Sequence, residues 1–274
     1  MQLTLGYSPC PNDTFIFHAL SHGLVEAPFR LQVRHEDVET LNQLARQSML
    51  DLTKISYHAF GHLRDQYCLL RAGGALGRGC GPLVVAKRPM EMRELVDQTI
   101  AIPGELTTAN LLLQLHGEGY RKLKVMSFEQ IMSAVALGEV AAGVIIHESR
   151  FTFAEQGLVK LLDLGDWWEQ ETGHPIPLGG ILAKRNLGKA LINAVDDAIG
   201  RSLDYAWAHP RQATAYICAH AQEMDEAVMR QHIELYVNQY SRDLGDAGVA
   251  AVEDLFARAE KRGLIPGSSQ ALFV

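Results

Sequence analysis

A histidine at the end of an apolar segment is the residue of this chain best suited to acid–base chemistry. His147 follows the apolar residues 143–146 and precedes Glu148-Ser149-Arg150, where the backbone must turn. A neutral imidazole that is partly shielded from water can accept a proton at physiological pH. A buried histidine bonded to a backbone carbonyl would occupy the same position, so position alone does not decide between these roles.

Hydroxyl and amide side chains at segment ends are suited to binding an anion. Ser56 follows the apolar residues 52–55, and Thr107-Thr108 begins an apolar helical segment. The simple structural role of Thr107 and Thr108 is to cap that helix. Free N–H groups at a helix start also attract a carboxylate or phosphate, and both roles can hold at once. Asn42, one turn into a predicted helix over residues 39–47, is a further polar contact for a cleft.

Patterns for metal sites and nucleophiles are weak. The pairs His18/His22 and His58/His62 have the i, i+4 spacing of a helix face, but neither forms an HExxH motif. We therefore expect no metal. Cys10, between two prolines, could be a nucleophile near a helix N-terminus, although a packed turn residue is the favoured interpretation.

The glycine-rich residues 73–81 do not form a dinucleotide loop. Such a loop leads from a strand into a helix, whereas here Pro82 and an apolar strand over residues 83–86 follow. We interpret the segment as the connection at which the chain changes lobes. Arg78 within it is a candidate anion contact.

Short apolar segments alternate with helical periodicity along the chain, which is typical of an α/β fold. We predict strands over residues 3–7, 31–34, 52–55, 83–86, 99–102, 123–126, 143–146 and 181–183. We predict helices from a cap at residues 12–14 to residue 23, over residues 39–47, 108–116 and 129–137, and after residue 187 with breaks near His209-Pro210, Gln222 and Gly245.

Ser56 and His147 occupy matching positions in two helix–strand units. Parallel α/β sheets place ligands at the carboxyl ends of their strands. Two lobes facing one another would therefore bring Ser56 and His147 to opposite walls of a cleft. The predicted first lobe contains residues 1–88 and 187–274, and the second contains residues 89–186.

Composition narrows the class of protein. The 274 residues contain 25 Lys+Arg and 32 Asp+Glu, so the net charge is 25 − 32 = −7, without a basic block. Nucleic acid and anionic membranes are therefore poor partners. No 18-residue apolar run and no secretory leader occur, and the four cysteines are well separated, so we expect a cytoplasmic protein. Neither the composition nor the order of residues indicates an oligomeric state.

Several long motifs in order carry a family resemblance. They are Ser8-Pro9-Cys10-Pro11-Asn12-Asp13-Thr14-Phe15, Asp37-Val38-Glu39-Thr40-Leu41-Asn42, the segment 73–85, and Ile145-Ile146-His147-Glu148-Ser149-Arg150-Phe151. Together they resemble the 1,4-dihydroxy-6-naphthoate synthases of the futalosine route of menaquinone biosynthesis. The resemblance extends over essentially the whole chain.

The resemblance implies a fold, a reaction and site residues. The fold would be a two-lobed α/β fold like that of the type 2 periplasmic binding proteins, with a ligand cleft between the lobes. The reaction would split cyclic dehypoxanthinylfutalosine, a small-molecule carboxylate, to 1,4-dihydroxy-6-naphthoate without a metal or redox cofactor. His147 would be the proton acceptor. The implied substrate contacts are Lys54, Ile55, Ser56, Thr108 and Ala109, to which we add Asn42 and Arg78.

Two other functions stay open. The chorismate dehydratases of the same pathway resemble this fold and also act without a cofactor, but the IIHESR and SPCPND stretches favour the naphthoate synthases. A non-catalytic module that binds a small acid belongs to a different class. Release of naphthoate by the purified protein would separate the three.

Overall fold

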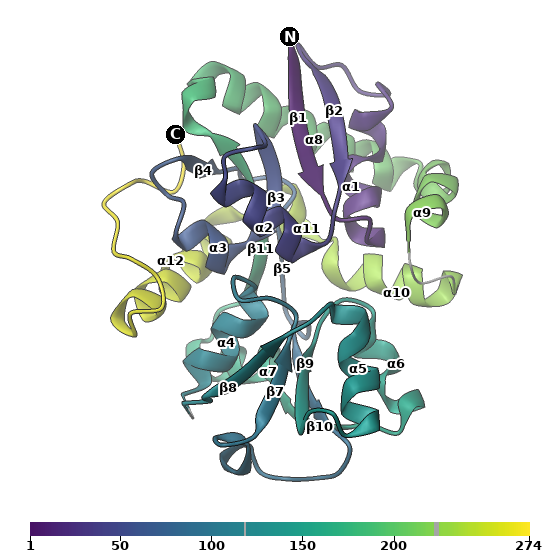
Figure 1. The fold of residues 1–274 in the computed structure, drawn as a ribbon. Helices are drawn as coiled ribbons and strands as arrows, with labels where there is room; N and C mark the ends of the chain where they lie inside the picture. Colours follow the sequence, from purple (N-terminus) through teal and green to yellow (C-terminus); the bar gives the residue numbers. More distant parts are fainter. Residues whose placement is uncertain (118, 222–224) are drawn as a thin grey trace.

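Two β-sheets, one in each half of the molecule, organise the chain (Figure 1). The structure is a computed structural model that describes residues 1–117, 119–221 and 225–274. The predicted break near Gln222 lies outside the described residues. Among the described helices, none is both long and apolar enough to cross a membrane.

The first sheet has the strand order β2-β1-β3-β11-β4, and β5 pairs with β11. Its strands are β1 (Gln2–Tyr7), β2 (Arg30–His35), β3 (Leu52–Ser56), β4 (Tyr67–Leu69), β5 (Ala75–Gly77) and β11 (Ile176–Lys184). β1 is parallel to β2 and β3, whereas β11 is antiparallel to β3, β4 and β5. Every residue of β3 is buried, because helices cover both faces of the sheet.

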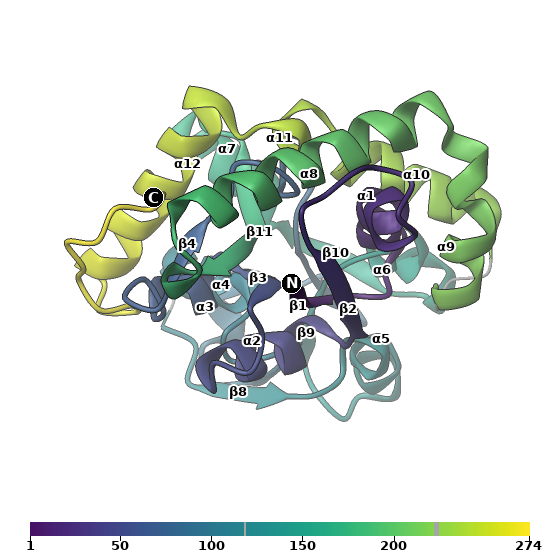
Figure 2. The ribbon, with the colours of Figure 1, turned by 90° about the horizontal axis from the view of Figure 1, so that it is seen from above.

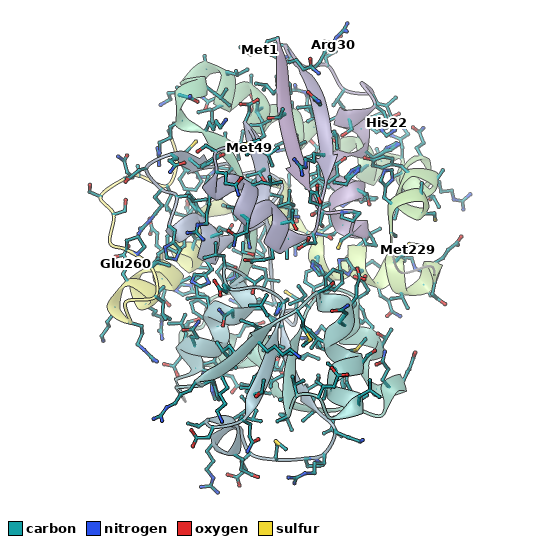
Figure 3. The ribbon with its side chains drawn as sticks, in the orientation of Figure 1. Met1, His22, Arg30, Met49, Met229 and Glu260 are labelled. Carbon is teal, nitrogen blue, oxygen red and sulfur yellow. The ribbon has the colours of Figure 1, made fainter. Side chains whose placement is uncertain are left out.

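Seen from above, α1 (Pro11–Ser21) and α8 (Lys189–Ala208) lie over one face of this sheet, and α2 (Val38–Arg46) and α3 (Tyr57–Gly61) lie over the other (Figure 2). Figure 3 labels Met1 and Arg30 together at the outer end of β1 and β2. The carboxyl ends of these parallel strands therefore point toward the second half.

The second sheet has the order β10-β6-β9-β7-β8. Its strands are β6 (Leu83–Ala86), β7 (Thr99–Ile102), β8 (Lys122–Val125), β9 (Ala142–Ile145) and β10 (Val159–Asp163). Its helices are α4 (Thr108–His116), α5 (Phe128–Leu137), α6 (Ser149–Thr152) and α7 (Leu164–Thr172), with the short 3-10 helices η1 (Met92–Leu95) and η2 (Phe153–Gln156). One core cluster contains residues of both halves, so the two sheets share packing.

The remaining helices return to the first half. They are η3 (Arg185–Leu187), η4 (Pro210–Ala213), α9 (Thr214–His220), α10 (Glu226–Tyr236), α11 (Gln239–Arg242) and α12 (Gly245–Lys261). α10 packs on α1, and α12 packs on α4 and β11. α10 thereby lies beside α1, from which it is remote in the sequence.

Many sequence predictions are confirmed within a residue or two, and three elements match their predicted bounds: β6, β7 and α4. The predicted cap of α1 at residues 12–14 is wrong. The helix begins at Pro11 after Cys10, whose extended backbone precedes it without a side-chain cap. Proline fits the first helical position because its missing N–H has no partner to lose there. Strands β4, β5 and β10 and helix α7 were not predicted.

The first crossing between the sheets lies at the end of the glycine-rich segment, as interpreted from the sequence, but both crossings come before the predicted lobe boundaries. Residues 78–82 connect β5 of the first sheet to β6 of the second, and residues 173–175 connect α7 to β11. A boundary at residue 88 would place β6 in the first lobe, although β6 belongs to the second sheet. A boundary at residue 186 would place β11 in the second lobe, although β11 belongs to the first sheet. Apolar strands look alike in either sheet, so composition could not assign β6 and β11 to their sheets.

The first crossing packs against α7 through a glycine. A Cβ atom at Gly165 would lie 1.9 Å from the carbonyl oxygen of Cys80, which is backbone and has little room to move. We expect Gly165→Ala to lower the free energy of unfolding by about 2 kcal/mol through overpacking. Urea unfolding followed by circular dichroism measures this. Gly267→Ala, exposed and with no atom within 4 Å of the added Cβ, is the matched control. Equal midpoints for both variants would contradict the packing argument.

Candidate active site

A cavity lies between the two halves and is lined by residues of both. Its walls come from the β1–α1 turn, β3, the start of α4, the residues after β9, and α10. The chemically relevant lining residues are Ser8, Asn12, Asp13, Lys54, Ile55, Ser56, Thr107, Thr108, Ala109, His147, His232 and Tyr236.

His147 lies two residues beyond β9 and lines this cavity. Its φ of +56° is in the left-handed region, which non-glycine residues seldom adopt and which occurs often at functional sites. Burial lowers the pKa of His147 below its ordinary value, and the carboxylate of Glu148 opposes this effect. The imidazole is therefore neutral at pH 7 and can accept a proton.

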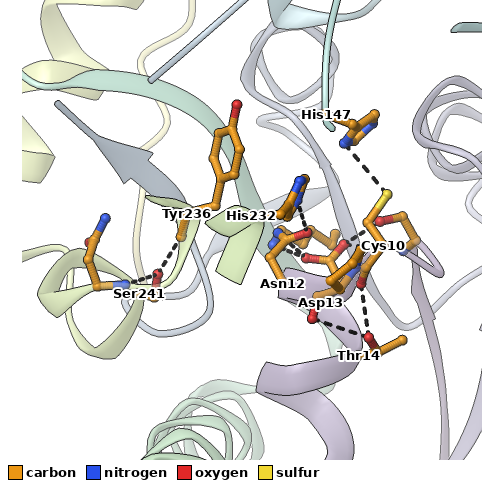
Figure 4. Close-up of polar contacts among 12 residues, drawn as sticks. Cys10, Asn12, Asp13, Thr14, His147, His232, Tyr236 and Ser241 are labelled. Atoms are coloured by element: carbon orange, nitrogen blue, oxygen red, sulfur yellow. Dashed lines mark hydrogen bonds and ion pairs between the residues drawn. The ribbon is translucent and has the colours of Figure 1, made fainter. Parts of the chain in front are cut away.

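A thiol, a phenyl ring and a second imidazole surround the His147 ring. Its Nδ1 lies 3.6 Å from Cys10 Sγ, and its ring centroid lies 5.0 Å from that of Phe128 and 6.2 Å from that of His232 (Figure 4). Burial, reinforced by the charge of Glu148, raises the pKa of the Cys10 thiol. The contact therefore joins a neutral thiol to a neutral imidazole.

Asp13 fixes the turn that faces His147. Its carboxylate accepts hydrogen bonds from Ser8 N (3.3 Å), Ser8 Oγ (2.7 Å) and Asn12 Nδ2 (2.8 Å), and it forms an ion pair with Lys54 Nζ. Asp13 is 3% exposed and Lys54 is 7% exposed. Charges so deeply buried need each other and saturated hydrogen bonding, and this network meets both needs. It also holds the Lys54 ammonium in the cavity wall.

Asn42 positions Ser56 rather than facing the cavity. Its Oδ1 accepts from Ser56 N (3.0 Å), and its Nδ2 donates to Ser56 Oγ (3.3 Å) and to Glu39 Oε2 (3.1 Å). Because Ser56 Oγ accepts from this amide, its own hydroxyl hydrogen is available to donate to a ligand in the cavity.

The start of α4 offers backbone donors at another part of the cavity wall. Thr107 caps the helix by accepting from Asn110 N (3.2 Å), while the Thr108 hydroxyl donates to the carbonyl of Leu178 in β11 (2.5 Å). The hydroxyl hydrogen of Thr108 is thus committed to a bond between the two halves. The first-turn N–H groups of Thr108 and Ala109 are the donors that a helix leaves for an anion.

The structure brings together most of the residues singled out from the sequence. Lining one cavity are Lys54, Ile55, Ser56, Thr108, Ala109 and His147, and Asn42 lies directly behind Ser56. Arg78 is the exception. Its guanidinium pairs with Glu169 in α7 (3.2 Å) and donates to the carbonyl of Gly173 (2.8 Å), so it fastens the interlobe crossing and does not line the cavity.

Sequence reasoning considered Asn12 only as a helix cap and gave no site role to Asn12, His232 or Tyr236. His232 and Tyr236 are four residues apart in α10, a spacing that places both on one helix face. His232 Nε2 lies 3.0 Å from Asn12 Oδ1, across 220 positions of sequence. No local pattern reports such a long-range contact. For cation binding, the described residues offer one close group, Cys10, His147 and Glu148, with ligand atoms within 4.8 Å of one another.

Comparison with solved structures identifies the fold of this chain. The chain matches protein AF1704 from Archaeoglobus fulgidus with a TM-score of 0.91 and 36% identity, over 96% of this chain and 98% of that one. It matches the alkanesulfonate-binding protein SsuA from Xanthomonas axonopodis pv. citri with a TM-score of 0.73 and 14% identity, over 97% and 94%. The predicted two-lobed α/β fold of the periplasmic binding proteins is confirmed.

Sequence comparisons give the family. A family model described as menaquinone biosynthesis matches residues 3–261. A 1,4-dihydroxy-6-naphthoate synthase of Thermus thermophilus is 54% identical over 272 residues, covering 99% of both chains. One of Streptomyces coelicolor is 46% identical over 269 residues, covering 96% of this chain and 95% of its own. This chain therefore belongs to the menaquinone biosynthesis family that includes these two synthases.

Proposed function

We propose that this protein cleaves cyclic dehypoxanthinylfutalosine to 1,4-dihydroxy-6-naphthoate in the cytoplasm, with His147 as the general base. The observation that carries the proposal is one cavity that is lined both by the imidazole of His147, just beyond β9, and by Lys54, Ser56, Thr108 and Ala109, whose donors suit a carboxylate. Two relatives that match nearly the whole chain bear the name of this synthase, which supports the substrate class.

The Cys10 contact supports an assignment of the imidazole tautomer. If Nδ1–H donates to Cys10 Sγ, the lone pair of the neutral ring resides on Nε2. Nε2 then removes the proton that starts electron flow in the spirocyclic substrate. The carbon–carbon bond breaks as the remaining ring becomes aromatic, and aromatisation supplies much of the driving force.

The wall formed by β3 and the start of α4 would hold the substrate by its carboxylate. The N–H groups of Thr108 and Ala109, the hydroxyl of Ser56 and the ammonium of Lys54 are all oriented by bonds within the protein. Donors fixed before binding stabilise negative charge without reorganisation. The same wall could stabilise oxygen charge that develops during cleavage.

The direct test incubates the purified protein with cyclic dehypoxanthinylfutalosine and follows 1,4-dihydroxy-6-naphthoate by chromatography. We expect stoichiometric release of the naphthoate without an added cofactor. Saturable binding without product would favour a non-catalytic binding module. Consumption of chorismate instead would favour the dehydratase.

His147→Asn removes the base while retaining a polar side chain of similar size. We expect kcat to fall by about 10²- to 10⁴-fold with substrate affinity nearly unchanged, because proton transfer rather than binding is lost. Single-turnover rates and calorimetric titration measure the two effects. His209→Asn, at an exposed position, is the control. Turnover close to that of the unmodified protein would remove His147 from the base role.

The pH dependence follows from the lowered pKa of His147. Only the neutral imidazole can accept the proton, so kcat/KM should fall with acid as the ring is protonated. Because burial lowers the pKa, the midpoint should lie below the ordinary value of about 6.5, and the rate should be flat near pH 7. Initial rates at constant ionic strength give the profile. A midpoint above pH 7 is incompatible with this environment.

Ser56→Ala removes one donor to the bound acid. We expect affinity for the naphthoate product to fall by about 5- to 20-fold, the effect of one hydrogen bond to a charged group. Calorimetric titration of the product measures it. The control is Ser133→Ala, at an exposed position of α5. Unchanged affinity in Ser56→Ala would show that the hydroxyl does not contact the ligand.

A further inference from the structure

Three different ligand atoms meet beside the His147 ring. Cys10 Sγ, His147 Nδ1 and a carboxylate oxygen of Glu148 all lie within 4.8 Å of one another. One sulfur, one imidazole nitrogen and one carboxylate oxygen form a donor set that Zn²⁺ accepts in proteins. Three protein ligands with a fourth position open is the arrangement of zinc sites that also bind a small molecule.

The distance between Cys10 Sγ and His147 Nδ1 matches that between two atoms bound to the same zinc ion. Tetrahedral zinc, with Zn–S of about 2.3 Å and Zn–N of about 2.05 Å, places sulfur and nitrogen about 3.6 Å apart. Cys10 Sγ and His147 Nδ1 are 3.6 Å apart. The Glu148 oxygen lies within 4.8 Å of both atoms, so a small movement of its side chain toward them would complete the donor set.

A second observation also points to a cation at this place. Asn12 Nδ2 donates to Asp13, so Asn12 Oδ1 is an acceptor and takes the N–H of His232 Nε2. The neutral His232 ring therefore carries its lone pair on Nδ1, which lies 3.8 Å from Glu148 Oε2. Neither atom has a hydrogen-bond partner among the described residues, and His232 is 1% exposed.

Two buried acceptors that face each other without a donor are costly unless positive charge or a donor lies between them. A cation held by Cys10, His147 and Glu148 satisfies Glu148 directly and places positive charge near His232. The thiolate and the carboxylate together balance its two positive charges, and the neutral imidazole adds none. A side cavity lined by all three ligands also includes Asp37, which is exposed and gives the ion a negatively charged approach.

We propose that Cys10, His147 and Glu148 form a Zn²⁺ site, with His232 Nδ1 beside its open position, and that zinc bound there blocks turnover. The blocking effect rests on the proposed function, whereas the site does not. Bonds form from zinc to Cys10 Sγ, His147 Nδ1 and the Glu148 oxygen as the thiol proton leaves to solvent. The hydrogen of the imidazole then resides on Nε2, so the ring has no lone pair left to accept a substrate proton.

Cobalt substitution tests the site without reference to activity. Titration of the full chain with Co²⁺ should produce a sulfur-to-cobalt charge-transfer band that saturates at one ion per chain and disappears when Zn²⁺ is added. Cys10→Ser should abolish the band, and Glu148→Gln should weaken Zn²⁺ affinity at least about tenfold. Cys218→Ser, which removes a partly exposed thiol outside the cluster, should leave the band unchanged.

Each contrary result overturns a defined part of the proposal. Absence of the band, or its retention in Cys10→Ser, would overturn the site. Circular dichroism monitors folding, and if Cys10→Ser does not fold, unchanged Zn²⁺ affinity in Glu148→Gln overturns the site instead. Added Zn²⁺ should reduce naphthoate release in proportion to occupancy, and a chelator should restore it. Full turnover with zinc bound would overturn the blocking effect, and a chain inactive toward the substrate would still give the cobalt result.

Discussion

The ion pair between Asp13 and Lys54 is the interaction on which the cavity depends. It joins the first turn of α1 to β3 at a place with almost no solvent, and Asn12 extends it to His232 in α10. Loss of either charge would leave the other buried and uncompensated, at a cost of about 3–5 kcal/mol. The turn it holds carries Cys10, so the same network determines what touches the His147 ring.

Two elements of the second half, β9 and α4, contribute different chemistry to the cavity because a strand ends there in one case and a helix begins in the other. A strand end presents His147 as a side chain that is neutral and ready to accept a proton, whereas a helix start presents Thr108 and Ala109 as backbone donors. The hydroxyl bond from Thr108 to Leu178 joins the second half to β11. The position of the α4 donors relative to Ser56, which pairs with Gly179 of β11, is thus tied to the packing of the two sheets.

The sequence predicted what depends on local pattern and missed what depends on distant packing. β6, β7 and α4 have clear apolar boundaries, and Ser56 and His147 follow apolar strands, so their position at the cavity was predictable. His232 was not, since its place beside Asn12 requires α10 to pack on α1. Arg78 was misassigned because a basic residue in a glycine-rich segment looks the same whether it binds a ligand or, as here, Glu169.

The central claim is that a bound organic acid lies between an imidazole base and the start of α4. A crystal structure with 1,4-dihydroxy-6-naphthoate bound tests it most directly. The account predicts the carboxylate within hydrogen-bond distance of the Thr108 and Ala109 N–H groups and the Ser56 hydroxyl, with the aromatic rings extending toward His147. A ligand lying outside this cavity, or one with its carboxylate against His147 and no contact to α4, would contradict it.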